Sequence, residues 1–224
     1  SSRTISYTMT ILGSILEQAV KDDIIPKNYM KNIDRPKQVK VRHMITLSVD
    51  EVKNFLSNIS NVEHHALFKL AFATGMRRSE LLGLRWSDID FKKSTISISQ
   101  TALKIGSTAV ISHTTKTTSS KRIIAIDTET LQELMKHKTV IDKRRIKTIN
   151  WINNNLVFPG IKGGPRCPDE VSKLCKKYAN LIDKPSFTMH GTRHTHATLL
   201  IENGANMKAI QERLGHASFQ ETMD

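Results

Sequence analysis

The sequence has little cysteine and no long apolar run. Its 224 residues include two cysteines, Cys167 and Cys175, whose spacing fits neither a metal site nor a redox motif. Since no disulfide framework follows, we expect a protein of a reducing cytoplasm. No apolar run approaches the ~18–20 residues that a membrane span needs, and we expect no signal peptide. We therefore expect no membrane partner.

Acidic residues are also scarce relative to basic ones. The chain has 34 Lys and Arg against 21 Asp and Glu, a formal net charge of +13. Such an excess is typical of proteins that bind nucleic acid, although a basic protein without a polyanionic partner remains an alternative. The length fits one sizeable domain and a fragment of another.

The hydrophobic periodicity predicts a mainly α protein with a small antiparallel β-sheet, an α+β fold. Strict alternation over residues 95–126 predicts short strands with turns near 106–107 and 116–121. Apolar residues at helical spacing predict the other elements. The expected helices are 4–21, 63–74, 129–147, 169–180, 193–202 and 207–214, and the expected strands are 95–99, 109–111 and 122–126.

Two local signals fix helix boundaries near the candidate site. Ser48 and Glu51 have the spacing of a capping box, so a helix should begin after Ser48. Residues 63–74 are apolar nearly all round, which is typical of a buried helix. Gly75 suits a left-handed position after that helix, so Arg77 should lie at the start of the next one.

Arginine and histidine residues near two helix starts form a candidate anion site. His190, Arg193 and His194 share one helix face, and Thr188 is a plausible cap before them. Arg77 repeats the arrangement, because it also follows a helix break. An arginine there can hold two phosphate oxygens, and free backbone N–H groups favour an anion. Taken singly, each residue is more often structural.

Two further features of this region have simple interpretations. Glu80 lies three residues after Arg77 and is expected to pair with it and orient it. His190, His194 and His196 could suggest a metal, but no carboxylate lies nearby before Glu202, and helical zinc sites commonly use one. We therefore expect no metal site.

Taken together, four sequence boxes closely resemble the tyrosine recombinase (phage-type integrase) family. They are Thr74–Arg77, the turn lysine Lys116, His190–Arg193 and Leu214–His216. The resemblance runs from about residue 47 to the end of the chain and implies the family's catalytic-domain fold. Residues 1–36 resemble the last part of the family's core-binding domain with the start of a linker, and 37–46 the linker itself. One position departs from the pattern, since Thr192 stands where the family often has leucine.

The resemblance implies a mechanism in which a tyrosine attacks DNA and leaves a 3′-phosphotyrosine. Arg77 and Arg193 would hold the non-bridging oxygens, and His216 would add a hydrogen bond. Lys116 would protonate the leaving 5′-oxygen, and His190 would accept or orient the tyrosine proton. No cofactor or metal is needed, since the phosphotyrosine conserves the energy of the broken bond.

The family's tyrosine is expected at or just past Asp224, because no tyrosine follows Tyr178. The catalytic domain, 47–224, is thus expected to be truncated before its nucleophile. The chain alone should bind DNA without cutting it, as a possible monomer. The longer parent is expected to act as a tetramer on double-stranded attachment-type sites of a phage or mobile element.

Basic residues flanking the site are expected to contact DNA. These are Lys37, Lys40, Arg42, Lys121 and Arg122. A second basic cluster lies in the predicted helix 129–147, with a solvated helix face as its alternative. Its members are Lys136, Lys138, Lys143, Arg144, Arg145 and Lys147. Two other functions stay open, a type IB topoisomerase and a non-catalytic DNA-binding module.

Overall fold

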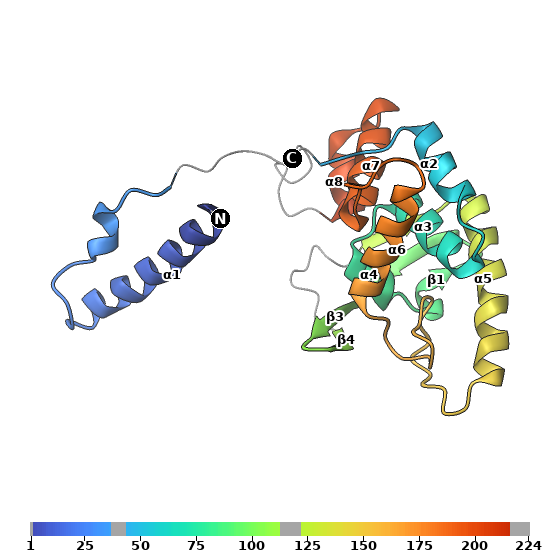
Figure 1. The fold of residues 1–224 in the computed structure, drawn as a ribbon, viewed down its shortest axis with the longest axis horizontal. Helices are drawn as coiled ribbons and strands as arrows, with labels where there is room; N and C mark the ends of the chain where they lie inside the picture. Colours follow the sequence, from blue (N-terminus) through green and yellow to red (C-terminus); the bar gives the residue numbers. More distant parts are fainter. Residues whose placement is uncertain (1, 37–43, 113–121, 216–224) are drawn as a thin grey trace. The chain divides into compact units, whose positions relative to one another are not determined.

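The computed structural model describes residues 2–36, 44–112 and 122–215 (Figure 1). It divides into two units, residues 1–43 and 44–224. In the first, α1 (Ser2–Lys21) is followed by the short helix η1 (Tyr29–Asn32). Asn28 ties the two together, because its amide donates to the Gly13 carbonyl and to the Glu17 carboxylate at 2.9 and 2.8 Å.

The second unit is mainly helical with small antiparallel sheets, which confirms the predicted fold class. Its helices are α2 (Val49–Ser57), α3 (Val62–Thr74), α4 (Arg78–Gly83), α5 (Thr128–Lys147), α6 (Pro168–Asn180), α7 (Met189–Glu202) and α8 (Met207–Leu214), with the short helix η2 (Trp86–Asp88). Its strands are β1 (Ile89–Asp90), β2 (Thr95–Ile98), β3 (Thr101–Ile105), β4 (Thr108–Ser112) and β5 (Arg122–Ala125).

The central helix of this unit is α3, with α5 packed on one side and α7 on another (Figure 1). Its two ends follow the local signals: Asn61 caps the first turn, and Gly75 adopts the predicted left-handed conformation with φ 62°. The side chains of α3 are buried around most of its circumference, as its composition predicts. The capping box of Ser48 and Glu51 is also present at the start of α2.

The described strands form two sheets where the sequence suggested one. The three-stranded sheet has the order β1-β2-β5, and β3 pairs only with β4. Gln100 accounts for the break, because this buried residue separates β2 from β3 and donates its amide to the Gly83 carbonyl at 2.7 Å. β3 was missed because its last three residues are exposed, so its pattern does not alternate.

An aromatic cluster joins α2, α3 and α6 with the segment before α7. The ring of Phe55 lies 5.1 Å from Phe68, 5.5 Å from Phe72 and 6.0 Å from Phe187, centroid to centroid. All of these contacts are edge-on, the arrangement that aromatic quadrupoles favour. The cluster fixes the start of α7 against α3, and this contact sets the geometry of the site.

Candidate active site

Arg77 is held at the junction between α3 and α4. Gly75 allows the sharp turn, and a Cβ atom at this position would lie 2.7 Å from side-chain atoms of His196 and Leu214. Arg77 then occupies the N-cap of α4, the position that the sequence predicts. Its side chain is 36% exposed, so solvent and a bound anion can reach it.

Glu80 orients Arg77 through two contacts. Its carboxylate accepts from the Arg77 backbone N–H at 2.8 Å and from Nη1 at 3.1 Å. Burial alone would raise the pKa of Glu80, but hydrogen bonds and charge from Arg122 and Arg77 hold that pKa below its ordinary value. Glu80 is therefore a buried carboxylate ion, in the orienting position expected for it.

The histidine and second arginine lie on α7. This helix begins at Met189, earlier than the predicted 193, and the Thr188 side chain accepts from the Gly191 N–H at 3.3 Å. His190 is thus in the first turn and Arg193 in the second. The His190 and His194 rings meet edge-on, with centroids 4.6 Å apart.

Arg193 is buried, unlike an arginine that binds a phosphate at the protein surface. The residue is 3% exposed, and its guanidinium donates to the carbonyls of Gly75 and Leu214, each at 2.8 Å. The first carbonyl belongs to the turn that carries Arg77. Arg193 therefore joins α7, the α3–α4 junction and the end of α8.

One cavity of about 400 Å³ brings the parts of the site together. Its lining includes Arg77, His190 and Arg193, together with Arg78 and Ser172. Arg78 donates to the hydroxyl of Ser172 and to the Pro168 carbonyl, which attaches α6 to this wall. The cavity is lined by three arginines and a histidine, which suits an anion such as a phosphodiester.

His190 is suited to accept a proton. Partial burial, then the positive charges of Arg193 and Arg77, lower the pKa of His190 below its ordinary value. The imidazole is therefore neutral at pH 7 and can act as a base. His194 has a lowered pKa as well, through burial and the neighbouring His190 and Arg193.

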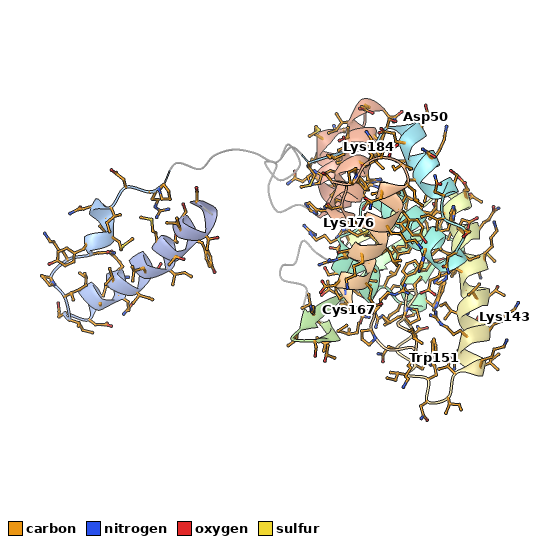
Figure 2. All side chains as sticks on the ribbon, in the orientation of Figure 1. Asp50, Lys143, Trp151, Cys167, Lys176 and Lys184 are labelled. Carbon is orange, nitrogen blue, oxygen red and sulfur yellow. The ribbon has the colours of Figure 1, made fainter. Side chains whose placement is uncertain are left out.

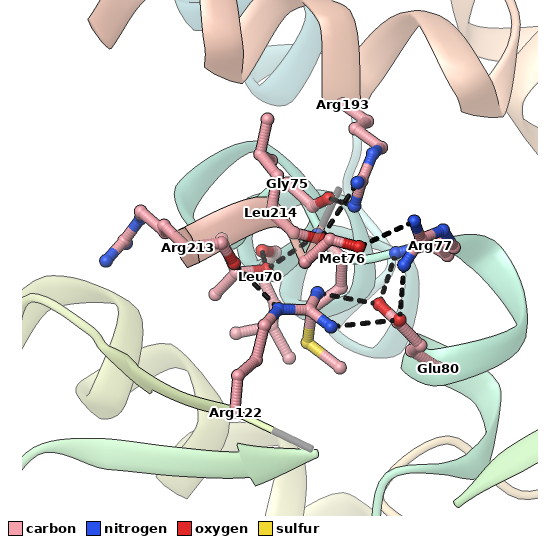
Figure 3. A network of polar contacts seen from close by, with 11 residues as sticks. Leu70, Gly75, Met76, Arg77, Glu80, Arg122, Arg193, Arg213 and Leu214 are labelled. Atoms are coloured by element: carbon pink, nitrogen blue, oxygen red, sulfur yellow. Dashed lines mark hydrogen bonds and ion pairs between the residues drawn. The ribbon is translucent and has the colours of Figure 1, made fainter. Parts of the chain in front are cut away.

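Arg122 does not lie where a DNA contact requires it. Its side chain is 7% exposed and forms an ion pair with Glu80 at 2.9 Å. The structure favours another role for Arg122 than the expected DNA contact, because its guanidinium is turned into the network of Figure 3. A buried carboxylate next to a basic strand position attracts the arginine inward, which the sequence pattern does not reveal.

Several basic residues of α5 form ion pairs. Lys136 and Lys138 pair with Glu133 and Asp142 of the same helix, at 2.7 and 2.9 Å. Arg144 turns inward to the buried Glu63 at 2.8 Å. Lys143 projects outward from α5 (Figure 2).

Sequence reasoning missed Arg213 and the role of His196. The imidazole Nδ1 of His196 lies 2.8 Å from the Phe72 carbonyl, and Arg213 Nε donates to its Nε2 at 3.0 Å. Nδ1 must therefore carry the proton. No group of His, Cys, Asp or Glu suited to a metal occurs among the described residues.

Tyr178 is part of the core. It is 5% exposed, and its hydroxyl lies 2.8 Å from Nδ1 of His64. Burial raises the pKa of Tyr178, which opposes formation of a phenolate. This tyrosine is therefore a packing residue.

Several predicted residues lie outside the described parts of the chain. These are Lys37, Lys40, Arg42, Lys116, Lys121 and His216. Their assigned roles remain predictions.

The fold agrees with comparisons to known proteins. The model of the phage integrase family matches residues 46–224, and the chain belongs to this family. It is 29% identical to a XerC-like tyrosine recombinase of Caldanaerobacter subterraneus subsp. tengcongensis, over 99% of this chain and 61% of that protein. It is 28% identical to the integrase of Staphylococcus phage L54a, over 98% of this chain and 65% of the relative.

Among solved structures, the Tn1549 transposon integrase in complex with transposon right end DNA is similar. That match has a TM-score of 0.82 and 25% identity, and covers 99% of this chain and 73% of the other. The chain spans 61% and 65% of the two relatives named above. Among the described residues, no helix has the length and apolar character to cross a bilayer.

Proposed function

We propose that this chain is the phosphodiester-binding part of a site-specific DNA recombinase of a phage or mobile element. The observation that carries the proposal is the convergence of Arg77, His190 and Arg193 on one cavity, from the α3–α4 junction and from α7. The relatives include a phage integrase and a transposon integrase solved on DNA, which supports this class of partner.

In this proposal, Arg77 is the exposed phosphate ligand. Two of its contacts, to Glu80 and to the Gly215 carbonyl, fix the guanidinium plane and leave other N–H donors directed away from these partners. As charge develops on the non-bridging oxygens, such fixed donors stabilise the transition state without reorganisation. Arg193 adds positive charge from its buried position and fixes the turn on which Arg77 lies.

His190 supplies the proton acceptor. Its neutral imidazole in the first turn of α7 can take or orient the proton of an attacking tyrosine hydroxyl. We propose that Lys116 protonates the leaving 5′-oxygen and that His216 donates to the phosphate, in line with the family pattern. The reaction calls for no cofactor, since the 3′-phosphotyrosine keeps the bond energy for religation.

We propose double-stranded DNA in a bacterial cytoplasm as the partner, with a tetramer as the recombining assembly. Lys37, Lys40, Arg42 and Lys121 are proposed as phosphate contacts. The formal net charge of +13 supports a binding mode that depends strongly on salt.

The test uses the full-length protein and a nicked suicide duplex, on which a covalent protein–DNA adduct accumulates. Arg77→Lys should slow adduct formation by ~10²–10³, the usual cost of losing one fixed donor to an oxyanion. Arg193→Lys should slow it by a similar factor, because a lysine cannot hold both the Gly75 and the Leu214 carbonyl in this geometry and the turn with Arg77 would shift. DNA affinity should stay within a few-fold. Lys93→Gln, at an exposed turn lysine outside the cavity, is the control for a change of surface charge.

Adduct formation at the wild-type rate in both arginine variants would contradict the assigned roles. Relaxation of supercoiled plasmid without recombinant product would favour a topoisomerase instead. DNA binding without any wild-type adduct would leave a non-catalytic binding module.

A further inference from the structure

Three arginines from distant segments bind successive carbonyls at the C-terminal end of α8. The contacts are Arg122 Nε to Arg213 O at 2.7 Å, Arg193 Nη2 to Leu214 O at 2.8 Å, and Arg77 Nη2 to Gly215 O at 2.9 Å. Figure 3 shows them converging from separate directions on this end of α8. We call Arg77, Arg122 and Arg193 the arginine cap.

The arginine cap satisfies groups that a helix leaves without partners. The last carbonyls of a helix have no intrahelical donor and carry a partial negative charge, so cations there are favourable. In α8, Gly215 adopts a left-handed conformation with φ 68° and donates its N–H back to Gln211 at 2.8 Å. The arginines supply donors to the next carbonyls along the chain, those of Arg213, Leu214 and Gly215.

Glu80 joins two members of the arginine cap. It accepts from Arg122 Nη1 at 3.0 Å and Nη2 at 2.9 Å, and from Arg77 Nη1 at 3.1 Å. The Arg122 pair is bidentate, which fixes direction as well as distance. The Glu80 side chain is 3% exposed, so water competes little for these bonds.

Gly215 leaves the space that this arrangement needs. A Cβ atom at Gly215 would lie 2.9 Å from Arg122 Nη1 and 3.2 Å from Cδ. A side chain there would therefore displace the guanidinium from Glu80. The glycine and the arginine depend on each other, although they come from different elements.

We propose that Arg122 is a positioning residue of the active site, which aligns Arg77 through Glu80 and fixes the end of α8 where the chain enters His216. The inference rests on the proposed function. Its buried side chain leaves Arg122 little surface for a direct DNA contact. It connects β5, the strand after the segment with Lys116, to the phosphate ligand on α4 and to the last turn of α8.

The first experiment separates positioning from DNA binding. In the full-length protein, Arg122→Gln should slow covalent adduct formation on a nicked suicide duplex at least ~30-fold, a loss within the range for misplaced catalytic groups. Affinity for an intact duplex site should change less than about threefold, since a buried side chain makes no phosphate contact. A parallel loss of affinity and adduct would overturn the inference in favour of a DNA contact.

Arg122→Lys keeps the charge beside Glu80 and protects the fold. A lysine cannot donate to both carboxylate oxygens and to the Arg213 carbonyl at once, so adduct formation should still fall about tenfold. Adduct formation at the wild-type rate in a folded Arg122→Lys protein would overturn the inference. Thermal unfolding by tryptophan fluorescence establishes that each variant is folded.

The second experiment asks whether Arg122 acts through the end of α8. Residues that act as a unit show non-additive losses. In a His216→Ala background, Arg122→Gln should cost less than half of its logarithmic effect in the wild type. Full additivity would overturn the route through α8.

Two matched controls test for general effects. Ile123→Gln changes the next, outward-facing residue of β5, and Lys93→Gln removes one positive charge from an exposed turn. Both should form adduct at the wild-type rate. A wild-type protein without any adduct would refute the proposed function and this inference with it, whereas normal adduct in the Arg122 variants refutes the inference alone.

Discussion

The contact between His196 and Arg213 predicts that the second unit loses stability in mild acid. His196 is buried on α7, accepts from Arg213 Nε at 3.0 Å and lies 2.8 Å from the Phe72 carbonyl. Burial, then the charges of Arg213 and Arg193, lower the pKa of His196 to about 4. A proton on Nε2 would face the Arg213 guanidinium, so protonation of His196 is unfavourable in the folded state.

The sign and size of the effect follow from linkage. In the unfolded chain the imidazole has its ordinary pKa of ~6.5, so the unfolded state binds the proton first as pH falls. Stability is therefore intact above about pH 6.5 and is lost progressively down to the folded pKa of about 4. A difference of ~2.5 pKa units amounts to about 3 kcal/mol in full, of which about 2 kcal/mol is lost by pH 5.

Urea unfolding at pH 7.5 and 5.0 measures this loss. The two tryptophans, Trp86 and Trp151, both lie in the unit 44–224, so their fluorescence reports on that unit alone. Burial also lowers the pKa of other histidines, His64 and His137 among them, and these add to the total. The difference between the wild type and His196→Gln isolates the residue of interest.

The wild type should lose about 2 kcal/mol more than His196→Gln between pH 7.5 and 5.0. Arg213→Gln removes one cause of the lowered pKa, so its loss should be intermediate. Equal losses in the wild type and His196→Gln would refute the reasoning, because a histidine in this contact must resist protonation.

The remaining predictions concern backbone space, thiol reactivity and salt. Gly75→Ala should destabilise the second unit by about 2–4 kcal/mol in urea unfolding, because the left-handed φ and the close contacts to His196 and Leu214 both oppose a Cβ atom. A thiol reagent at pH 8 should modify Cys167 well before Cys175, since burial raises the pKa of Cys175 to about 12; equal rates would show that α6 opens. Affinity for duplex DNA should fall ~10³–10⁵-fold between 50 and 200 mM salt if ~6–10 phosphates are contacted, as read by fluorescence anisotropy, and a shallow slope would contradict an electrostatic interface.

The sequence predicted the parts of the fold that depend on local chemistry. The capping box at Ser48, the glycine turn at Gly75 and the buried helix between them follow from residue types over a few positions. The Arg77–Glu80 pair is local as well, because its partners are three positions apart. The sequence predicted Thr188 as the cap of α7 but placed the helix start at residue 193. The helix begins directly after the cap, at Met189.

The non-local contacts could not be read from the chain. Arg122 is a basic residue at a strand start, and only the fold places it beside Glu80, which is 42 positions away. Arg213 resembles an ordinary cation in the last turn of α8, yet it reaches His196, Ala73 and Ala125. Periodicity carries no information on such pairings, because both partners are polar residues within mixed patterns.

The hydrogen-bond network connects sequence boxes that are far apart in the chain. Arg193 binds the Gly75 carbonyl of the first box and the Leu214 carbonyl of the last, so a shift of α7 moves both. Glu80 is buried and binds both Arg77 and Arg122, so removing either arginine would leave the buried carboxylate with fewer donors. We expect these buried ion pairs to specify one arrangement of four segments more than to add stability. In the proposed function, a phosphate would then meet ligands that are already fixed.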